Sequence, residues 1–260
     1  MSFKFIDKIG LEIEGGWDKS RGDLIADGSV HVQDFVTSPK CTGELVSQPF
    51  SDIGDAISFV MNNWPTESTK RCGFHIHVSF KNIAYYSALM ERKFFDYFIQ
   101  KMTEFGEKWD GTNRILNPLF WERLEDKNQF CRKIFAPDKQ VKLKAKGTSD
   151  RYTQINYCYS FHKTVECRLF PTFIDPNLAV AALKALVNCY ESYLSQNETV
   201  LNKEISFTLD EECDEIKKHL KKSSDKITHF NYFFYKGLIA EPATKKDYKE
   251  ISGKFFSEEF

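Results

Sequence analysis

The sequence lacks several features that would assign it to a class directly. No stretch of its 260 residues is apolar over the length that spans a membrane, and the first residues contain no long apolar run. The formal net charge is −1, so overall charge favours neither nucleic acid nor a membrane surface as a partner. The seven cysteines are odd in number and include no Cys-x-x-Cys pair, which argues against a disulfide framework or a zinc ribbon. We therefore expect a soluble, cytoplasmic protein in a reducing compartment.

Several catalytic signatures are missing as well. The chain has no Gly-x-x-x-x-Gly-Lys-[Ser/Thr] loop, which argues against a P-loop nucleotide enzyme. It has no Gly-x-Ser-x-Gly elbow and no catalytic cysteine signature. There is no internal repeat and no low-complexity segment. Chemistry must therefore come from residues that the fold brings together.

The stretch from Arg71 to Phe80 is the most informative one in the chain. Polar and apolar residues alternate here at a period of two, which predicts a strand. His75 and His77 fall on one face, and the other face is apolar. Core packing does not require two imidazoles on one face. Neutral imidazoles this close form a natural metal pair, although two satisfied core histidines remain an alternative.

Two further stretches show the same pattern with charged residues. Glu12 and Glu14 share one face of the stretch that begins at Ile9, and Glu166 shares a face with Arg168. Taken singly, a Glu-x-Glu is usually a solvated surface pair and a Glu-x-Arg is usually an ion pair of small value. Burying such charges in otherwise apolar strands is costly without partners, so their co-occurrence predicts a sheet with one polar, functional face.

The remaining pattern predicts an α+β fold with a mainly antiparallel sheet, because strands concentrate in the first half and again near residues 151–170. We expect a catalytic domain over 1–195, a helical extension over 196–260 packed on it, and an irregular, mobile basic segment over 110–150. The predicted elements are strands over 3–17, 24–26, 30–36, 42–46, 71–80, 151–159 and 164–170, and helices over 51–63, 83–109 and 177–195, with further helices after 198.

Six motifs stand in order along residues 5–175. They are residues 10–14 (Gly-Leu-Glu-Ile-Glu), 27–29 (Asp-Gly-Ser), 43–49 (Gly-Glu-Leu-Val-Ser-Gln-Pro), 73–78 (Gly-Phe-His-Ile-His-Val), 151–156 (Arg-Tyr-Thr-Gln-Ile-Asn) and 164–172 (Thr-Val-Glu-Cys-Arg-Leu-Phe-Pro-Thr). Together they resemble the amidoligase family. These are ATP-dependent carboxylate–amine ligases related to glutamate–cysteine ligase and glutamine synthetase, and they are frequent in phages and bacteria. The resemblance implies a glutamine synthetase-like catalytic fold, a curved antiparallel sheet with helices on its convex side.

The resemblance also implies roles for individual residues. It implies two Mg²⁺ ions, a choice that the oxygen-rich ligand set also favours, with Mn²⁺ as the alternative. It assigns Arg168 to the transferred phosphoryl group, and Arg132 and Arg151 to phosphate or substrate-carboxylate contacts. The expected metal ligands are Glu12, Glu14, Glu44, His75 or His77, and Glu166; the expected catalytic residues are Arg168, Arg151 and Glu166; and the expected ATP contacts are Arg132, Arg151, Arg168 and His77.

The function implied is amide-bond formation at the expense of ATP. The partners would be a small-molecule or peptide carboxylate and an amine or amino acid, with the basic segment 132–151 closing over the nucleotide. Three alternatives stay open: a phosphotransferase on the same fold, as in the guanidino kinases; a non-catalytic nucleotide or peptide binder; and a dinuclear metal hydrolase.

Overall fold

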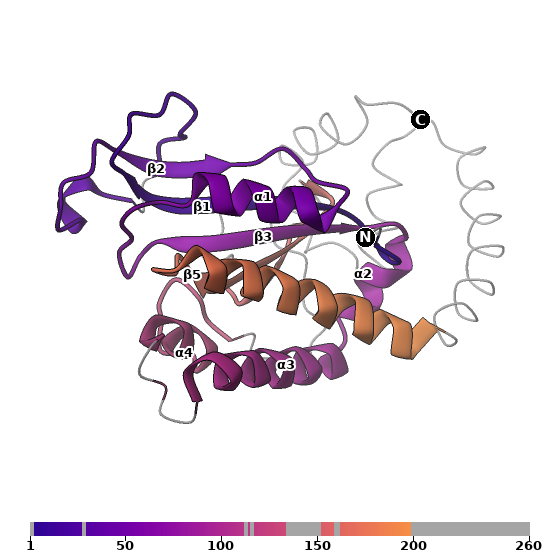
Figure 1. Ribbon diagram of the computed structural model, residues 1–260. Coiled ribbons are helices and arrows are strands. Elements are labelled where there is room, and N and C mark those ends of the chain that lie inside the picture. Colours follow the sequence, from indigo (N-terminus) through magenta and orange to yellow (C-terminus); the bar gives the residue numbers. More distant parts are fainter. Residues whose placement is uncertain are drawn as a thin grey trace, which may run out of the picture.

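One antiparallel sheet organises the fold (Figure 1). The computed structural model describes residues 3–27, 30–111, 114, 117–133, 152–158 and 162–198. The strands run in the order β2-β1-β3-β5-β4, and every neighbouring pair is antiparallel. The predicted α+β class with an antiparallel sheet is confirmed. The strands are β1 (Ile6–Trp17), β2 (Cys41–Val46), β3 (Gly73–Phe80), β4 (Ile155–Tyr157) and β5 (Val165–Pro171).

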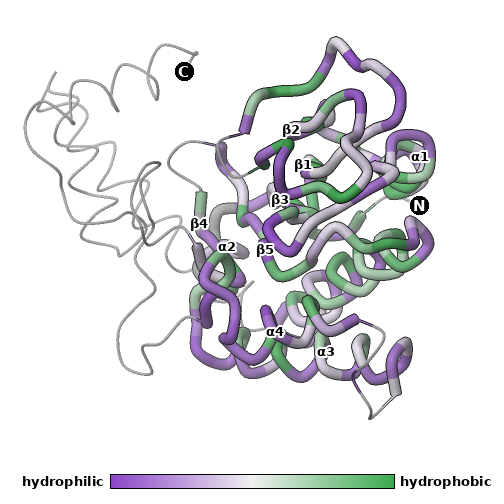
Figure 2. Tube along the Cα trace, turned by 90° about the vertical axis from the view of Figure 1, so that its left-hand side faces the viewer, coloured by the Kyte–Doolittle hydropathy of each residue, from purple (hydrophilic) through white to green (hydrophobic). Residues whose placement is uncertain are grey.

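The helices are interspersed with the strands along the chain and pack mainly against one side of the sheet. In the side view of Figure 2, α1 and α3 lie on the same side of the strands. Within the described ranges, no helix combines the length and the apolar character needed to cross a membrane. The helices are α1 (Ile53–Asn63), α2 (Ile83–Leu89), α3 (Arg92–Asp110), α4 (Pro118–Leu124) and a helix over residues 176–198.

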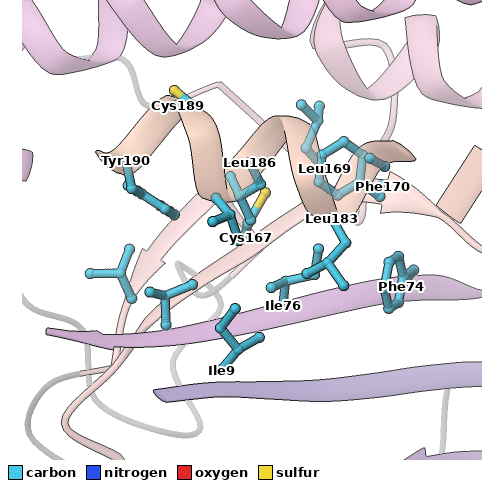
Figure 3. Close-up of a cluster of buried hydrophobic side chains, with 14 of the residues drawn as sticks. Ile9, Phe74, Ile76, Cys167, Leu169, Phe170, Leu183, Leu186, Cys189 and Tyr190 are labelled. Carbon is cyan, nitrogen blue, oxygen red and sulfur yellow. The ribbon is translucent and has the colours of Figure 1, made fainter. Parts of the chain in front are cut away.

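The apolar faces of the strands form the core against the 176–198 helix (Figure 3). Ile76 of β3 and Cys167 of β5 are fully buried beneath Leu183 and Leu186 of this helix. Burying each large apolar side chain contributes about 1.5–3 kcal/mol. Because successive strand residues point to opposite faces, this packing directs the alternate, polar residues of the same strands to the other face of the sheet.

A bulge in β5 disturbs the pairing of the two central strands. Phe74 of β3 lies opposite Phe170, whereas Ile76 lies opposite Cys167. Two residues of β5, Arg168 and Leu169, therefore stand where β3 has one. Such a bulge bends the strand and re-aims a side chain. Here Leu169 and the residue after it are both buried in the core, while Arg168 lines the polar face.

The prediction of one long helix over 83–109 is wrong. The chain forms α2 and α3 instead, and Glu91 between them has an extended backbone (φ −73°, ψ 148°). The two helices pack on different neighbours. In α2, the Tyr86 hydroxyl accepts a hydrogen bond from Phe80 N of β3 at 2.9 Å, whereas Phe94 of α3 stacks on Tyr190 of the 176–198 helix. The helical spacing of apolar residues continues through both helices, so it does not reveal the change of direction.

The predicted strand over 30–36 is also wrong. Val32–Asp34 forms a 3-10 helix, and Val32 and Val36 are exposed, because no neighbouring strand pairs with this segment in the described part of the chain. Of the 24–26 strand, Ile25 forms an isolated bridge with Glu44. Residues 30–36 have the alternation of a strand, but no described strand lies beside them to supply backbone hydrogen bonds.

The expectation of an irregular segment over 110–150 is wrong for residues 118–124, which form α4. A proline in its first turn starts this helix, where a missing backbone N–H costs nothing. Residues 134–151 of the predicted mobile basic loop are not among the described residues. The predicted helices after 198 also lie outside them.

Candidate functional site

A cavity of about 310 Å³ opens on the polar face of the sheet. Its walls combine carboxylates, imidazoles, guanidinium groups and aromatic rings. Among its lining residues are the acids Glu12, Glu14, Asp27, Glu44 and Glu166, the histidines His75, His77 and His162, the arginines Arg71, Arg123 and Arg168, and the rings of Phe130 and Tyr152.

Strand register brings these side chains together from distant segments. Glu14 of β1 lies opposite Glu44 of β2, and Glu12 lies opposite His75 of β3. His77 in turn lies opposite Glu166 of β5. Directly opposite residues in an antiparallel pair have Cβ atoms about 4.5–5.5 Å apart, so their functional groups share one space. The six predicted metal ligands thus lie in one cavity, while their roles stay predictions.

Among the described residues, the potential cation ligands form three overlapping groups. Within each group, one ligand atom per residue lies within 4.8 Å of the others. Glu12 belongs to two groups and Glu44 to two, so adjacent ions would share carboxylates. Carboxylates with few imidazoles suit Mg²⁺ or Mn²⁺ better than zinc. The groups are Glu12, His77 and Glu166; Glu12, Glu44 and His75; and Glu14, Asp27 and Glu44.

The electrostatics of Glu44 show what this crowding costs. Burial, with the charges of Glu12 and Glu14, raises the pKa of Glu44 to about 9. Burial would also raise the pKa of Glu12, but the imidazoles of His75 and His77 outweigh it and hold that pKa far below its ordinary value. The acids therefore cannot all ionise together unless positive charge enters the cluster. This donor set fits a divalent cation.

His77 presents one ring nitrogen to the acids. Its Nδ1 atom lies 3.1 Å from the Thr164 hydroxyl, which fixes the ring. Its Nε2 atom is buried without a hydrogen-bond partner among the described residues, 3.1 Å from Glu12 Oε1 and 3.9 Å from Glu166 Oε1. Burial lowers the pKa of His77, but these two carboxylates outweigh it and raise that pKa. A buried nitrogen that faces two carboxylates without hydrogen-bond geometry is suited to metal coordination.

His75 is held beside the same acids. Its Nδ1 atom lies 3.4 Å from Glu12 Oε2 and 3.7 Å from Glu166 Oε1. The ring also packs over the backbone of Gly73, where an added Cβ would lie only 2.2 Å from His75 Nε2. Gly73 N donates a hydrogen bond to Glu14 Oε2 at 2.6 Å. A glycine is therefore required here for the close approach of both side chains.

Glu166 and Arg168 form a buried ion pair. Arg168 donates to Glu166 Oε1, and Asn156 Nδ2 donates to Glu166 Oε2 at 2.8 Å. Burial would raise the pKa of Glu166, but the charge of Arg168 and then of His77 lowers it to about 2. The Arg168 guanidinium also lies 5.6 Å from the centre of the Tyr152 ring. Both groups are thus held charged and oriented inside the cavity.

The sequence reasoning did not assign several lining residues to the site, among them Asp27 and Arg123. Asp27 belongs to the motif at residues 27–29 but was given no ligand role, yet it joins Glu14 and Glu44 in the third group of potential ligands. Arg123 is 1% exposed and donates to the carbonyls of Cys72, Arg168 and Phe170 at 3.0–3.1 Å. An Asp-Gly pair signals a turn, and one arginine in a basic stretch signals nothing, so local pattern could not have found either.

Two predicted residues are not among the described residues that line this cavity. Arg132 is exposed, and its side chain is not among those lining the cavity. Arg151 lies outside the described residues. Their expected contacts with phosphate or substrate stay predictions.

Comparison with known proteins does not add to this picture. Neither the family models, nor the curated proteins, nor the solved structures contain a match to this chain.

Proposed function

We propose that this protein is an ATP- and Mg²⁺-dependent carboxylate–amine ligase with a glutamine synthetase-like catalytic fold. The observation that carries the proposal is the set of overlapping carboxylate groups, which share Glu12 and Glu44, beside a buried Arg168. Neighbouring divalent cations beside an arginine suit phosphoryl transfer, in which charge moves on to the leaving and transferred oxygens. The antiparallel sheet, with helices on one face and this cavity on the other, is the arrangement that the amidoligase resemblance implies.

The reaction needs activation because a carboxylate is a poor electrophile. One carboxylate oxygen of the acid attacks the γ-phosphorus of ATP, the bond to the β,γ-bridging oxygen breaks, and ADP leaves. The amine nitrogen then attacks the acyl phosphate carbon, the C–O bond breaks, and the amide and phosphate are released. The proton lost by the amine leaves on the phosphate, so atoms and charge balance.

The residues of the cavity divide the work. Glu12, Glu14, Glu44, Glu166 and one or both histidines would hold Mg²⁺ or Mn²⁺, which supplies charge neutralisation to the phosphates when bound. The Arg168 guanidinium is a fixed positive charge for the transferred phosphoryl group, and Glu166 and Tyr152 hold it in position. Because Arg168 is already oriented, little reorganisation is needed during the transfer.

The test is ADP formation with ATP, Mg²⁺ and pools of acids and amines. We expect ADP formation to require Mg²⁺ and both organic partners, with products one water lighter than the summed reactants by mass spectrometry. Hydroxylamine should trap the acyl phosphate as a hydroxamate, which a phosphotransferase would not give. Glu14→Gln should abolish turnover, whereas Glu104→Gln, on the exposed surface of α3, should not. Absence of Mg²⁺-dependent ADP formation with every pool would refute the proposal.

A further inference from the structure

Three guanidinium groups of the described residues line the cavity, and two of them make short contacts within the protein. Arg168 is paired with Glu166, and Arg123 donates to three backbone carbonyls. The Nε atom of each also lacks a hydrogen-bond partner among the described residues, but their Nη atoms hold the sheet or a predicted metal ligand in place. The third guanidinium group, that of Arg71, has only a long ion pair with Asp34.

Arg71 has donors to spare. Its Nη1 atom lies 3.5 Å from Asp34 Oδ2, which is at the limit of a hydrogen bond. Its Nε atom is buried and has no hydrogen-bond partner within the described part of the chain. A buried guanidinium N–H left without an acceptor is costly, and a guanidinium presents its N–H groups as a planar fork that matches two oxygens of one oxyanion.

The arginine is also held in place. Its guanidinium lies 5.4 Å from the centre of the Phe130 ring, and Phe130 packs edge-on against Tyr152 with ring centres 6.3 Å apart. Tyr152 in turn contacts the guanidinium of Arg168 with its ring. One aromatic pair therefore carries two guanidinium groups, the one expected at the transferred phosphoryl group and Arg71. A charge held this way loses little side-chain entropy when a ligand binds.

We propose that Arg71 binds an oxyanion of a substrate away from the reacting bond, either a second carboxylate of the acid or a phosphate of the nucleotide. The identity of the ligand rests on the proposed ligase function, but binding by Arg71 does not require turnover. The Asp34 carboxylate now occupies the edge of this site, and an incoming oxyanion takes its place on the guanidinium. If the oxyanion belongs to the acid, the preferred acids carry two carboxylates.

The experiment measures binding of two probe classes by titration calorimetry in the presence of Mg²⁺: ADP, and a series of linear dicarboxylates from malonate to adipate. Arg71→Gln should weaken the Kd of one probe class by about 10-fold or more, because charge-assisted hydrogen bonds are lost, and leave the other class unchanged. The affected class identifies the source of the oxyanion. Equal Kd values in the wild type and Arg71→Gln, or no binding of any probe to the wild type, would overturn the inference.

Three further variants separate binding from structure. Arg21→Gln is the matched control, because Arg21 also pairs with one aspartate, Asp23, and lies 5.7 Å from an aromatic ring, but outside the cavity. Asp34→Asn should tighten binding of the affected probe, because it removes the competing carboxylate; a purely structural ion pair predicts no such gain. If Arg71→Gln does not fold, Arg71→Lys should show a smaller loss in the same probe class, since the charge stays and the planar fork is lost.

These outcomes are independent of the ligase reaction. Turnover without an effect of Arg71 on either Kd would leave the proposed function intact and overturn this inference. Binding that depends on Arg71 without any turnover would support this inference and count against the proposed function.

Discussion

Glu14 and Glu44 face each other directly across the antiparallel pair of β1 and β2. Like charges in this position destabilise a sheet, so a stable fold is favoured by a proton or a cation between them. The raised pKa of Glu44, about 9, shows that a proton fills this need when no cation is bound. A divalent cation would replace the proton. The facing carboxylates thus destabilise the cation-free fold and at the same time favour cation binding.

The first prediction concerns the substitution Glu44→Gln. In EDTA, the variant should be more stable than the wild type by about 1 kcal/mol, because an acid crowded by other acids is gone. Mg²⁺ should raise the melting temperature of the wild type clearly and that of the variant much less. Thermal unfolding of both proteins with EDTA and with Mg²⁺ checks this. A variant that is less stable than the wild type in EDTA, or equally responsive to Mg²⁺, would contradict it.

The second prediction is a fall in metal-free stability with rising pH. The pKa of Glu44 is raised from 4.5 to about 9, so the folded chain keeps a proton that the unfolded chain releases. Its contribution is complete below pH 4.5 and is lost as the pH rises through about 9. The raised pKa of His77 acts in the same direction. The lowered pKa values of Glu12 and Glu166 act in the opposite direction: they stabilise the folded chain above the ordinary pKa of a glutamate, and this stability is lost as the pH falls below it.

Urea unfolding in EDTA measures this dependence. The free energy of unfolding should decline from about pH 5 to about pH 9, with a shallower decline for Glu44→Gln. Saturating Mg²⁺ should flatten the wild-type curve, since the bound cation displaces the proton. A wild-type curve that rises over this range would show that the acids are not crowded in the way described.

The third prediction uses two glycines of the same site. Alanine at Gly73 would place its Cβ 2.2 Å from His75 Nε2, whereas alanine at Gly10 would meet His77 Cβ at an ordinary 3.6 Å. Gly73→Ala should therefore displace the His75 ring and weaken Mn²⁺ binding by about 10-fold or more, which is typical when metal ligands lose their orientation. Gly10→Ala should bind Mn²⁺ nearly as the wild type does. Calorimetric titration of both variants with Mn²⁺ distinguishes these results; equal affinities would argue against His75 as a ligand.

The fourth prediction concerns Arg123. Arg123→Met removes the guanidinium donor from the carbonyls of Cys72, Arg168 and Phe170, so the free energy of unfolding should fall by about 3 kcal/mol or more. Arg123→Lys should rescue it only partly, because one ammonium cannot match the fork. The control is Arg92→Met, which removes only a surface pair with Asp96. A small effect at Arg123 would mean that the bulge in β5 does not depend on it.

The sequence predicted those parts of the site that lie on regular strands. Alternation alone placed Glu12 with Glu14 and His75 with His77 on one face, because the period of a strand fixes which residues share a side. The order of the strands cannot be derived from that alternation. The pairing of β1, β3 and β5 joins segments far apart in the sequence, and this pairing brings the polar faces of the three strands together.

The rest depends on tertiary contacts that no local pattern encodes. Asp27 reaches the acids because Ile25 bridges to Glu44. Arg123 enters the cavity wall because α4 packs on the end of β5, where Phe120 stacks on Phe170. In both cases the residue's own neighbours in sequence gave no sign of a role in the site. Burial and pairing with distant residues place both of them there.

The central claim is that Glu12 and Glu44 place divalent cations side by side. Electron paramagnetic resonance of the protein titrated with Mn²⁺ tests it most directly, because neighbouring ions that share carboxylates couple magnetically. We expect the wild type to bind at least two Mn²⁺ ions with a coupled spectrum, and Glu12→Gln to lose the coupling. A single uncoupled ion in the wild type, or coupling that survives in Glu12→Gln, would contradict the account.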